Sequence, residues 1–223
     1  MRFLYIFSIT LLYFLIISFN PSRADTPIFF TFVSDDGNYN FEGGFTVKAD
    51  SDVAWDVLTD YNHVSNFISN MHSHIKKTDG NDLIVEQDAG GGFLFIQEHL
   101  KALLTVHEEP LQSISFNDVS HKNFELYSGV WHLQPDASTG EIKVIYDLLA
   151  VRDGGTPDFL TADLFSGSLG DLLTETQREI GKRQIHKDKV TLEAAQKTAT
   201  ASPTSSVTIT PTVATSPIPT AAP

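Results

Sequence analysis

The chain of 223 residues carries 15 basic and 28 acidic residues, a net charge of −13, and it contains no cysteine. An acidic surface repels phosphate groups, so the composition argues against nucleic-acid binding and against electrostatic docking on anionic lipid. The lack of cysteine excludes disulfides, thiolate zinc sites and cysteine nucleophiles, so the core must stabilise the fold by itself.

The N-terminal segment has the pattern of a secretory signal peptide. A basic start precedes an apolar run from Phe3 to Phe19, and small residues follow at Ser22 and Ala24. We expect residues 1–24 to be a signal peptide cleaved after Ala24, and the protein to be exported, periplasmic or extracellular. An uncleaved membrane anchor is the alternative, because the run is near the lower limit for a membrane-spanning helix. Cleavage leaves 13 basic and 28 acidic residues, a net charge of −15.

The C-terminal segment, residues 197–223, consists mainly of Thr, Ser, Ala and Pro. It holds five of the ten prolines, and no charged residue follows Lys197. Such a composition cannot form a packed core, so we predict a disordered tail, with a glycosylated stalk or a wall-spanning spacer as the functional alternatives. Residues 25–196 remain, about 170 residues, which is the size of one domain.

One strand and two short helices are expected at the start of this domain. Residues 38–49 alternate between apolar and polar, and Gly43-Gly44 within them suggests a bulge or a sharp bend. Apolar residues then recur at helical spacing twice, from Ala54 to Tyr61 and again from Val64 to Met71. The break near Asp60 predicts two short helices at an angle, each with one apolar face.

Six strands with short connections are expected next. Turn residues such as Asp79-Gly80 and Gly90-Gly91-Gly92 separate segments that are rich in β-branched and aromatic residues. The predicted strands are residues 71–78, 83–88, 93–108, 113–119, 124–135 and 141–152. Consecutive strands joined by short turns predict an antiparallel meander.

A long helix is predicted from Asp158 to about His186, continuing weakly to Gln196. Its apolar stripe consists of Phe165, Leu169, Leu172, Leu173, Thr176 and Ile180. Gly167 and Gly170 each cost about 1 kcal/mol relative to alanine in a helix, which suggests a close approach of another element or a space beside the helix. The predicted fold class is α+β: a curved antiparallel sheet of about seven strands wrapped on this helix.

Several segments resemble the START-like superfamily of helix-grip proteins, which includes polyketide cyclase/dehydrase and coenzyme Q-binding proteins. They are "FTVKADSDVAWDVLTDYNHVSNFISNM", "LIVEQ", the pair "TVHEEP" and "SISF", and "FELYSGVWHLQP" followed by "GEIKVIYDL". The resemblance covers residues 38–185 and lies in hydrophobic pattern, in Trp55 with Asp60-Tyr61, and in Gly129-x-Trp131. No catalytic signature is part of it, so it supports the fold more strongly than any activity.

The resemblance implies an apolar cavity between the sheet and the last helix, which holds a lipid, quinone or isoprenoid. Trp131 and Tyr146 are the leading candidates to line it, because each combines a large apolar surface with one polar group. The full set of cavity candidates is Trp131, Tyr146, Leu133, Tyr127, Phe165, Leu169, Leu172, Tyr61 and Phe67. We expect a binding protein without a cofactor, which could contact a membrane transiently. A cyclase/dehydrase-type enzyme and an envelope interaction module with a filled core are the alternatives.

Polar clusters outside this set give weaker signals. His72 and His74 would share a strand face and could reach one metal ion, but no third ligand is evident, so no metal site is predicted. Glu98-His99 and His107-Glu108-Glu109 could be acid–base pairs, but adjacent strand residues point to opposite faces. We therefore interpret them as polar residues of a half-buried sheet, and we predict no catalytic residue.

Overall fold

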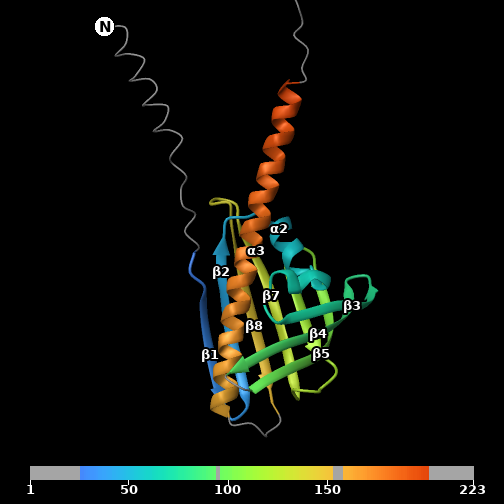
Figure 1. Ribbon diagram of the computed structural model, residues 1–223, viewed down its shortest axis with the longest axis vertical. Helices are drawn as coiled ribbons and strands as arrows, with labels where there is room; N and C mark the ends of the chain where they lie inside the picture. Colours follow the sequence, from blue (N-terminus) through green and yellow to red (C-terminus); the bar gives the residue numbers. More distant parts are fainter. Residues whose placement is uncertain (1–25, 94–95, 153–157, 201–223) are drawn as a thin grey trace, which may run out of the picture. The chain divides into compact units, whose positions relative to one another are not determined.

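The computed structural model describes residues 26–93, 96–152 and 158–200 (Figure 1). Side chains are described for these residues except 91–99, 158–165, 199 and 200. The predicted signal peptide, residues 1–24, lies outside the described residues, as does most of the predicted tail.

The described elements follow the predicted order, with one additional strand at the start. They are β1 (Phe29–Asp35), β2 (Asn38–Val47), α2 (Ser51–Leu58), the 3₁₀ helix η1 (Tyr61–Asn66), β3 (Met71–Asp79), β4 (Asp82–Phe93), β5 (Ile96–Glu109), β6 (Ser113–Asp118), β7 (Leu126–Asp136), β8 (Glu141–Val151) and α3 (Asp158–Thr200). The sheet therefore has eight strands where the sequence predicted about seven. The missed strand, β1, forms a hairpin with β2 through Asp36-Gly37, both of which adopt positive φ.

The strands form one antiparallel sheet in the order β1-β2-β8-β7-β6-β5-β4-β3. From β3 to β8, neighbours in sequence are neighbours in the sheet, which confirms the predicted meander. The chain crosses from β2 to β3, at the far edge of the sheet, through α2 and η1 (Figure 1). This crossover places the two short helices at one end of the sheet, where Trp55, Leu58 and Tyr61 pack against side chains of β4, β5 and β6.

The expected bulge at Gly43-Gly44 is absent, because β2 pairs with both neighbours without a register shift there. The glycines are required for a different reason. A Cβ atom on Gly43 would lie 2.8 Å from the Phe41 ring, and one on Gly44 would collide with the Val144 carbonyl oxygen. The pair of glycines therefore permits close packing at this point of the sheet, not a change of register.

The chain divides into two compact units at the peptide bond between Ile185 and His186. The N-terminal part of α3 belongs to the first unit and packs on the sheet through Leu169, Leu173 and Ile180, which are at most 5% exposed. Gln177 Nε2 donates to the backbone carbonyls of Thr26 and Thr46, at 2.7 and 3.1 Å. In the second unit the helix continues to Thr200, past the predicted weak end at Gln196. No described helix combines the length and the apolar character needed to span a membrane.

Two separate hydrophobic clusters stabilise the first unit. The larger cluster joins β1, β2, β7, β8, α2 and α3, and the smaller one consists of Leu83, Val85, Leu104, Val106 and Ile114 on β4, β5 and β6. Trp55, Leu58, Phe116, Tyr127 and Trp131 are only partly buried and contact both clusters. These five side chains therefore connect the two clusters, which do not form one continuous core.

Candidate functional site

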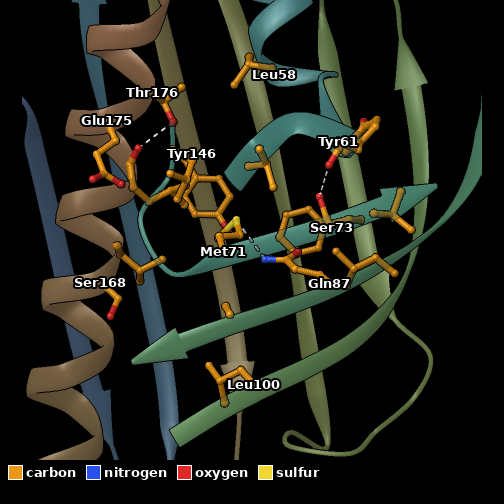
Figure 2. Close-up of a pocket in the computed structure, with 18 of the residues that line it drawn as sticks. Leu58, Tyr61, Met71, Ser73, Gln87, Leu100, Tyr146, Ser168, Glu175 and Thr176 are labelled. Carbon is orange, nitrogen blue, oxygen red and sulfur yellow. Dashed lines mark hydrogen bonds between the residues drawn. The ribbon is translucent and has the colours of Figure 1, made fainter. Parts of the chain in front are cut away.

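A cavity of about 360 Å³ lies where the two hydrophobic clusters separate. Figure 2 shows Ser168, Glu175 and Thr176 of α3 on one side of it, and Met71, Ser73 and Gln87 of β3 and β4 on the other. Its lining residues are Val57, Leu58, Asp60, Tyr61, Val64, Phe67, Ile68, Ser69, Asn70, Met71, Ser73, Val85, Gln87, Ala89, Gly90, Leu100, Leu104, Val106, Ile114, Phe116, Phe124, Tyr127, Trp131, Tyr146, Arg152, Ser168, Leu169, Asp171, Leu172, Glu175 and Thr176.

Aromatic side chains from β6, β7, β8 and the segment just before β7 form the wall of the cavity. The Trp131 and Tyr146 rings stack with their centroids 4.2 Å apart, and Tyr127 stacks on Phe124 at 5.3 Å. Phe116 joins the two pairs, because its ring centroid lies 5.6 Å from Tyr127 and 6.2 Å from Tyr146. The cross-strand pair Trp131–Tyr146 explains why these two residues face the same side of the sheet.

The cavity opens to solvent between α3 and the start of β3. Among the lining residues, Ser69, Asn70, Ser168 and Asp171 are exposed. Glu175 holds the two sides together, since its carboxylate accepts hydrogen bonds from the backbone N–H of Ser69 at 2.8 Å and from its hydroxyl at 2.6 Å. The opening is therefore polar, whereas the aromatic wall behind it is largely apolar.

A second set of contacts anchors the short helices at the end of the cavity. The Tyr61 hydroxyl donates to Glu108 Oε1 at 2.8 Å, and the Ser73 hydroxyl donates to the Tyr61 carbonyl at 2.5 Å (Figure 2). Arg183 of α3 donates to Asp60 Oδ2 at 2.7 Å and lies over the Phe67 ring, with its Cζ 5.5 Å from the centroid. The crossover between β2 and β3 is thus fixed to both the sheet and α3.

Four lining residues have a shifted pKa, and each shift moves the pKa further from 7. Burial raises the pKa of Tyr127 to about 12, although its interaction with the Tyr146 hydroxyl opposes the rise. Burial also raises the pKa of Tyr146, and burial together with the Glu108 carboxylate raises that of Tyr61. Burial acts to raise the pKa of Asp60, but its hydrogen bonds and charge interactions with Arg183 and His63 outweigh this and lower it. The tyrosines are neutral and Asp60 is ionised at pH 7, so none of these four groups is poised for proton transfer near neutrality.

The structure brings most of the predicted cavity residues together. Trp131, Tyr146, Tyr127, Leu169, Leu172, Tyr61 and Phe67 line the cavity. Leu133 does not, because it pairs with Val144 two residues along from the Trp131–Tyr146 pair and is buried in the larger hydrophobic cluster. The side chain of Phe165 lies outside the described residues. Contact of any of these residues with a ligand stays a prediction.

The polar residues that were considered for metal binding or acid–base chemistry do not come together in one site. His72 and His74 are exposed on β3, where His74 Nε2 lies 3.4 Å from Glu86 Oε2. His107 contacts Asp82 at 2.7 Å, whereas Glu108 turns to the other face and accepts from Tyr61. Glu98 and His99 lie where side chains are not described. The described residues contain no group of three side chains able to hold a metal ion.

Several residues of the cavity lining could not be predicted from the sequence. Glu175 and Ser69 are 106 residues apart, and only the tertiary fold brings them into contact. Gln87 donates to the Met71 sulfur at 3.6 Å. Nothing in the sequence of their two strands distinguishes either residue from its neighbours. Phe116 is the exception, because the alternation of β6 places it on the same face as the buried Ile114.

A curved antiparallel sheet that holds a C-terminal helix across an apolar cavity defines the helix-grip class of proteins. No protein-family model and no curated protein matches the sequence. Solved structures do match the fold. The Zhui aromatase/cyclase from Streptomyces sp. R1128 is 12% identical, with a TM-score of 0.56 over 66% of this chain and 95% of its own.

Two lipid-transfer proteins match as well. The STAR-related lipid transfer protein from Xanthomonas axonopodis is 18% identical, with a TM-score of 0.51 over 68% of this chain and 98% of its own. Human StAR-related lipid transfer protein 5 is 12% identical, with a TM-score of 0.51 over 79% of this chain and 95% of its own. The chain therefore has a START-like helix-grip fold. Identities this low establish the fold and not the activity, because this fold supports both transfer and cyclisation.

Proposed function

We propose that this chain is an exported protein that holds a hydrophobic small molecule, such as a lipid, quinone or isoprenoid, in the cavity between the sheet and α3. The observation that carries the proposal is the cavity itself, about 360 Å³ in volume and walled by Trp131, Tyr146, Tyr127 and Phe116. A concave site of this size, apolar with a few polar groups, is the usual form of a small-molecule site.

Binding without chemistry is favoured over the enzyme alternative by the titratable groups of the lining. A general acid or base acts best with a pKa near the working pH. The pKa values of Tyr61, Tyr127 and Tyr146 are raised and that of Asp60 is lowered, so each shift moves away from this range. The interaction module with a filled core is disfavoured by the cavity.

Export remains part of the proposal and is supported by the sequence of residues 1–24. It is tested by expressing the full chain in a host with a secretion pathway and determining the N-terminus of the product. A mature N-terminus at Asp25 supports export with cleavage after Ala24. A chain that remains in the cytoplasm with its N-terminus intact contradicts it.

The binding proposal is tested by native mass spectrometry of the gently purified full chain, followed by titration with neutral lipids, isoprenoid quinones and fatty acids. We expect either a co-purified hydrophobic molecule or micromolar binding of at least one class. Ala89→Phe adds a ring to a residue of the cavity lining and should weaken this binding at least tenfold. Ala137→Phe, in the exposed turn between β7 and β8, is the matched control and should not. A protein that purifies empty and binds no member of the panel refutes the proposal.

A further inference from the structure

The two edges of the sheet differ in how well they are protected against pairing with another strand. The edge strand β3 carries two histidines and two lysines, and its register with β4 shifts between Ile75 and Lys77. Charged side chains and an irregular register are common ways in which proteins protect an edge strand. The opposite edge strand, β1 (Figure 1), has no charged residue before Asp35 and pairs with β2 without a register shift. The edge at β1 therefore lacks the protection that β3 has.

One side of β1 is exposed along its whole length. Phe30 and Phe32 face the core side of the sheet, where their rings stack on aromatic residues of β2. The residues between them face the outer side, because side chains alternate along a strand. The outer-side residues are all exposed: Phe29, Thr31, Val33 and Asp35. Phe29 is 44% and Val33 is 56% exposed, so this side presents an apolar surface that ends in a carboxylate.

Two opposite charges lie at the two ends of this outer side. Lys143 of β8 reaches across β2, and its Nζ lies 5.3 Å from the centroid of the Phe29 ring. Asp35 lies at the far end of β1, about 20 Å from Phe29 at about 3.3 Å per residue. Neither Lys143 nor Asp35 forms an ion pair with any residue that the structure describes. Their separation prevents the two from pairing with each other within one copy of the chain.

Pairing of β1 with the same strand of a second copy brings these charges together. In an antiparallel pair centred on Phe32, each Phe29 lies opposite Asp35 of the second copy, with the two Cβ atoms about 5 Å apart on the same side of the joined sheet. The Lys143 ammonium over the Phe29 ring then lies beside that carboxylate, and the two-fold symmetry produces the contact twice. A shift by two residues would shorten the overlap from all of β1 to a part of it and would move Asp35 away from Phe29.

We propose that β1 is a homodimerisation interface, at which a second copy of this chain pairs antiparallel with β1 and joins the two sheets edge to edge. The pairing of one short strand buries less area than a standard interface of roughly 1,600 Å², so the dissociation constant is about 10–100 µM. Each copy is acidic, and the resulting repulsion is screened at about 0.15 M salt. The interface is independent of the proposed ligand binding.

The first test is sedimentation equilibrium at about 0.15 M salt, on the protein purified after expression of the full chain. We expect Asp35→Lys and Lys143→Glu each to raise the dissociation constant about three- to tenfold, because each variant places like charges together twice in the dimer. The double variant Asp35→Lys/Lys143→Glu reverses both charges and should restore the wild-type value to within about twofold. Asp79→Lys, the same charge change at an exposed position of β3, is the matched control and should not weaken the dimer.

The second test reads the register directly, because the chain has no cysteine of its own. In Phe29→Cys/Asp35→Cys the two thiols are about 20 Å apart within one copy, too far for a disulfide, but they lie opposite each other between copies. Mild oxidation should therefore yield a disulfide-linked dimer of this variant, whereas Phe29→Cys alone and Asp35→Cys alone should stay unlinked. A wild type that is monomeric up to about 200 µM overturns the proposal. A dimer that Asp35→Lys does not weaken, or that the double cysteine variant does not trap, also overturns it, since the copies then associate through another surface.

Discussion

Arg183 provides the sharpest test of how α3 is fixed to the short helices. Its guanidinium donates to Asp60 at 2.7 Å and to Glu179 at 2.9 Å, and it lies over the Phe67 ring. The side chains of Arg183, Asp60 and Glu179 are 30%, 21% and 11% exposed. The ion pairs are thus neither at the open surface, where a pair contributes about 0.2–1 kcal/mol, nor fully buried, where loss of one partner costs about 3–5 kcal/mol.

Arg183→Met keeps the length and the apolar stem of the side chain and removes the charge. We expect the free energy of unfolding at pH 7 to fall by about 2 kcal/mol, measured by urea denaturation. Lys182→Met is the matched control on the same turn. Lys182 pairs with Glu179 at 2.9 Å but is 73% exposed, so its replacement should cost less than about 0.5 kcal/mol. Equal effects of the two variants would refute the reasoning.

The pH dependence gives an independent check on the same contact. Interaction with Arg183 lowers the folded-state pKa of Asp60 and of Glu179 despite the opposing effect of burial. Such stabilisation is present above the unfolded-state pKa values, about 3.9 for Asp and 4.3 for Glu, and is lost as the pH falls through the folded-state values. The difference between wild type and Arg183→Met should therefore shrink between pH 5 and pH 3. A difference that stays constant over this range would show that the charge is not responsible.

Three further predictions concern packing, the cavity opening and the tyrosines. A Cβ on Gly129 would lie 2.6 Å from the Phe116 ring, so Gly129→Ala should destabilise by about 1–3 kcal/mol, whereas Gly167→Ala, with open space around it, should stabilise by up to about 1 kcal/mol. Thermal unfolding measures both, and the same sign for both would contradict the packing. Glu175→Gln weakens the two hydrogen bonds from Ser69 and should cost about 1 kcal/mol and speed ligand exchange in stopped-flow measurements; unchanged rates would mean that this contact does not limit entry. In a spectrophotometric titration, Tyr127 should remain protonated at pH 11, because burial raises its pKa to about 12, and Tyr127→Phe should then leave the tyrosinate absorbance at pH 11 unchanged. A loss of absorbance at that pH would contradict the burial of this hydroxyl.

Much of the fold could be predicted from local periodicity. Alternation over residues 141–152 predicted β8, and Ile142, Val144, Tyr146 and Leu148 are indeed buried on one face. The strand β1 was missed because its burial pattern lacks a clear alternation: Phe29, Phe30 and Val33 are all at least 44% exposed. Its contact with β2 consists of the hairpin pairing and two cross-strand ring stacks, Phe30–Phe41 at 5.6 Å and Phe32–Tyr39 at 6.1 Å, and these partners lie outside the strand itself. A strand at the edge of a sheet needs less burial than one at its centre, so it leaves a weaker pattern.

Two of the three glycines of α3, Gly167 and Gly170, show the limit of such reasoning. The sequence suggested either a close approach or an open space; the structure shows open space at Gly167 and an ordinary van der Waals contact at Gly170. A Cβ on Gly170 would meet the Phe30 ring at 3.6 Å, whereas nothing lies within 4 Å of Gly167. Both glycines have the same effect on helix propensity, so only the neighbouring element distinguishes them.

The sequence by itself determined the order of the elements after β1, the antiparallel meander and the long final helix, because each depends on side-chain spacing within a few residues. It also indicated Trp131, Tyr127 and Tyr146 as cavity candidates, whereas the register that sets Trp131 opposite Tyr146 was seen only in the structure. Only the tertiary structure decided that Leu133 is core while Leu172 faces the cavity, and that Glu175 reaches Ser69. Whether two apolar clusters merge or leave a space depends on the volumes of side chains more than a hundred residues apart, and no local pattern contains that information.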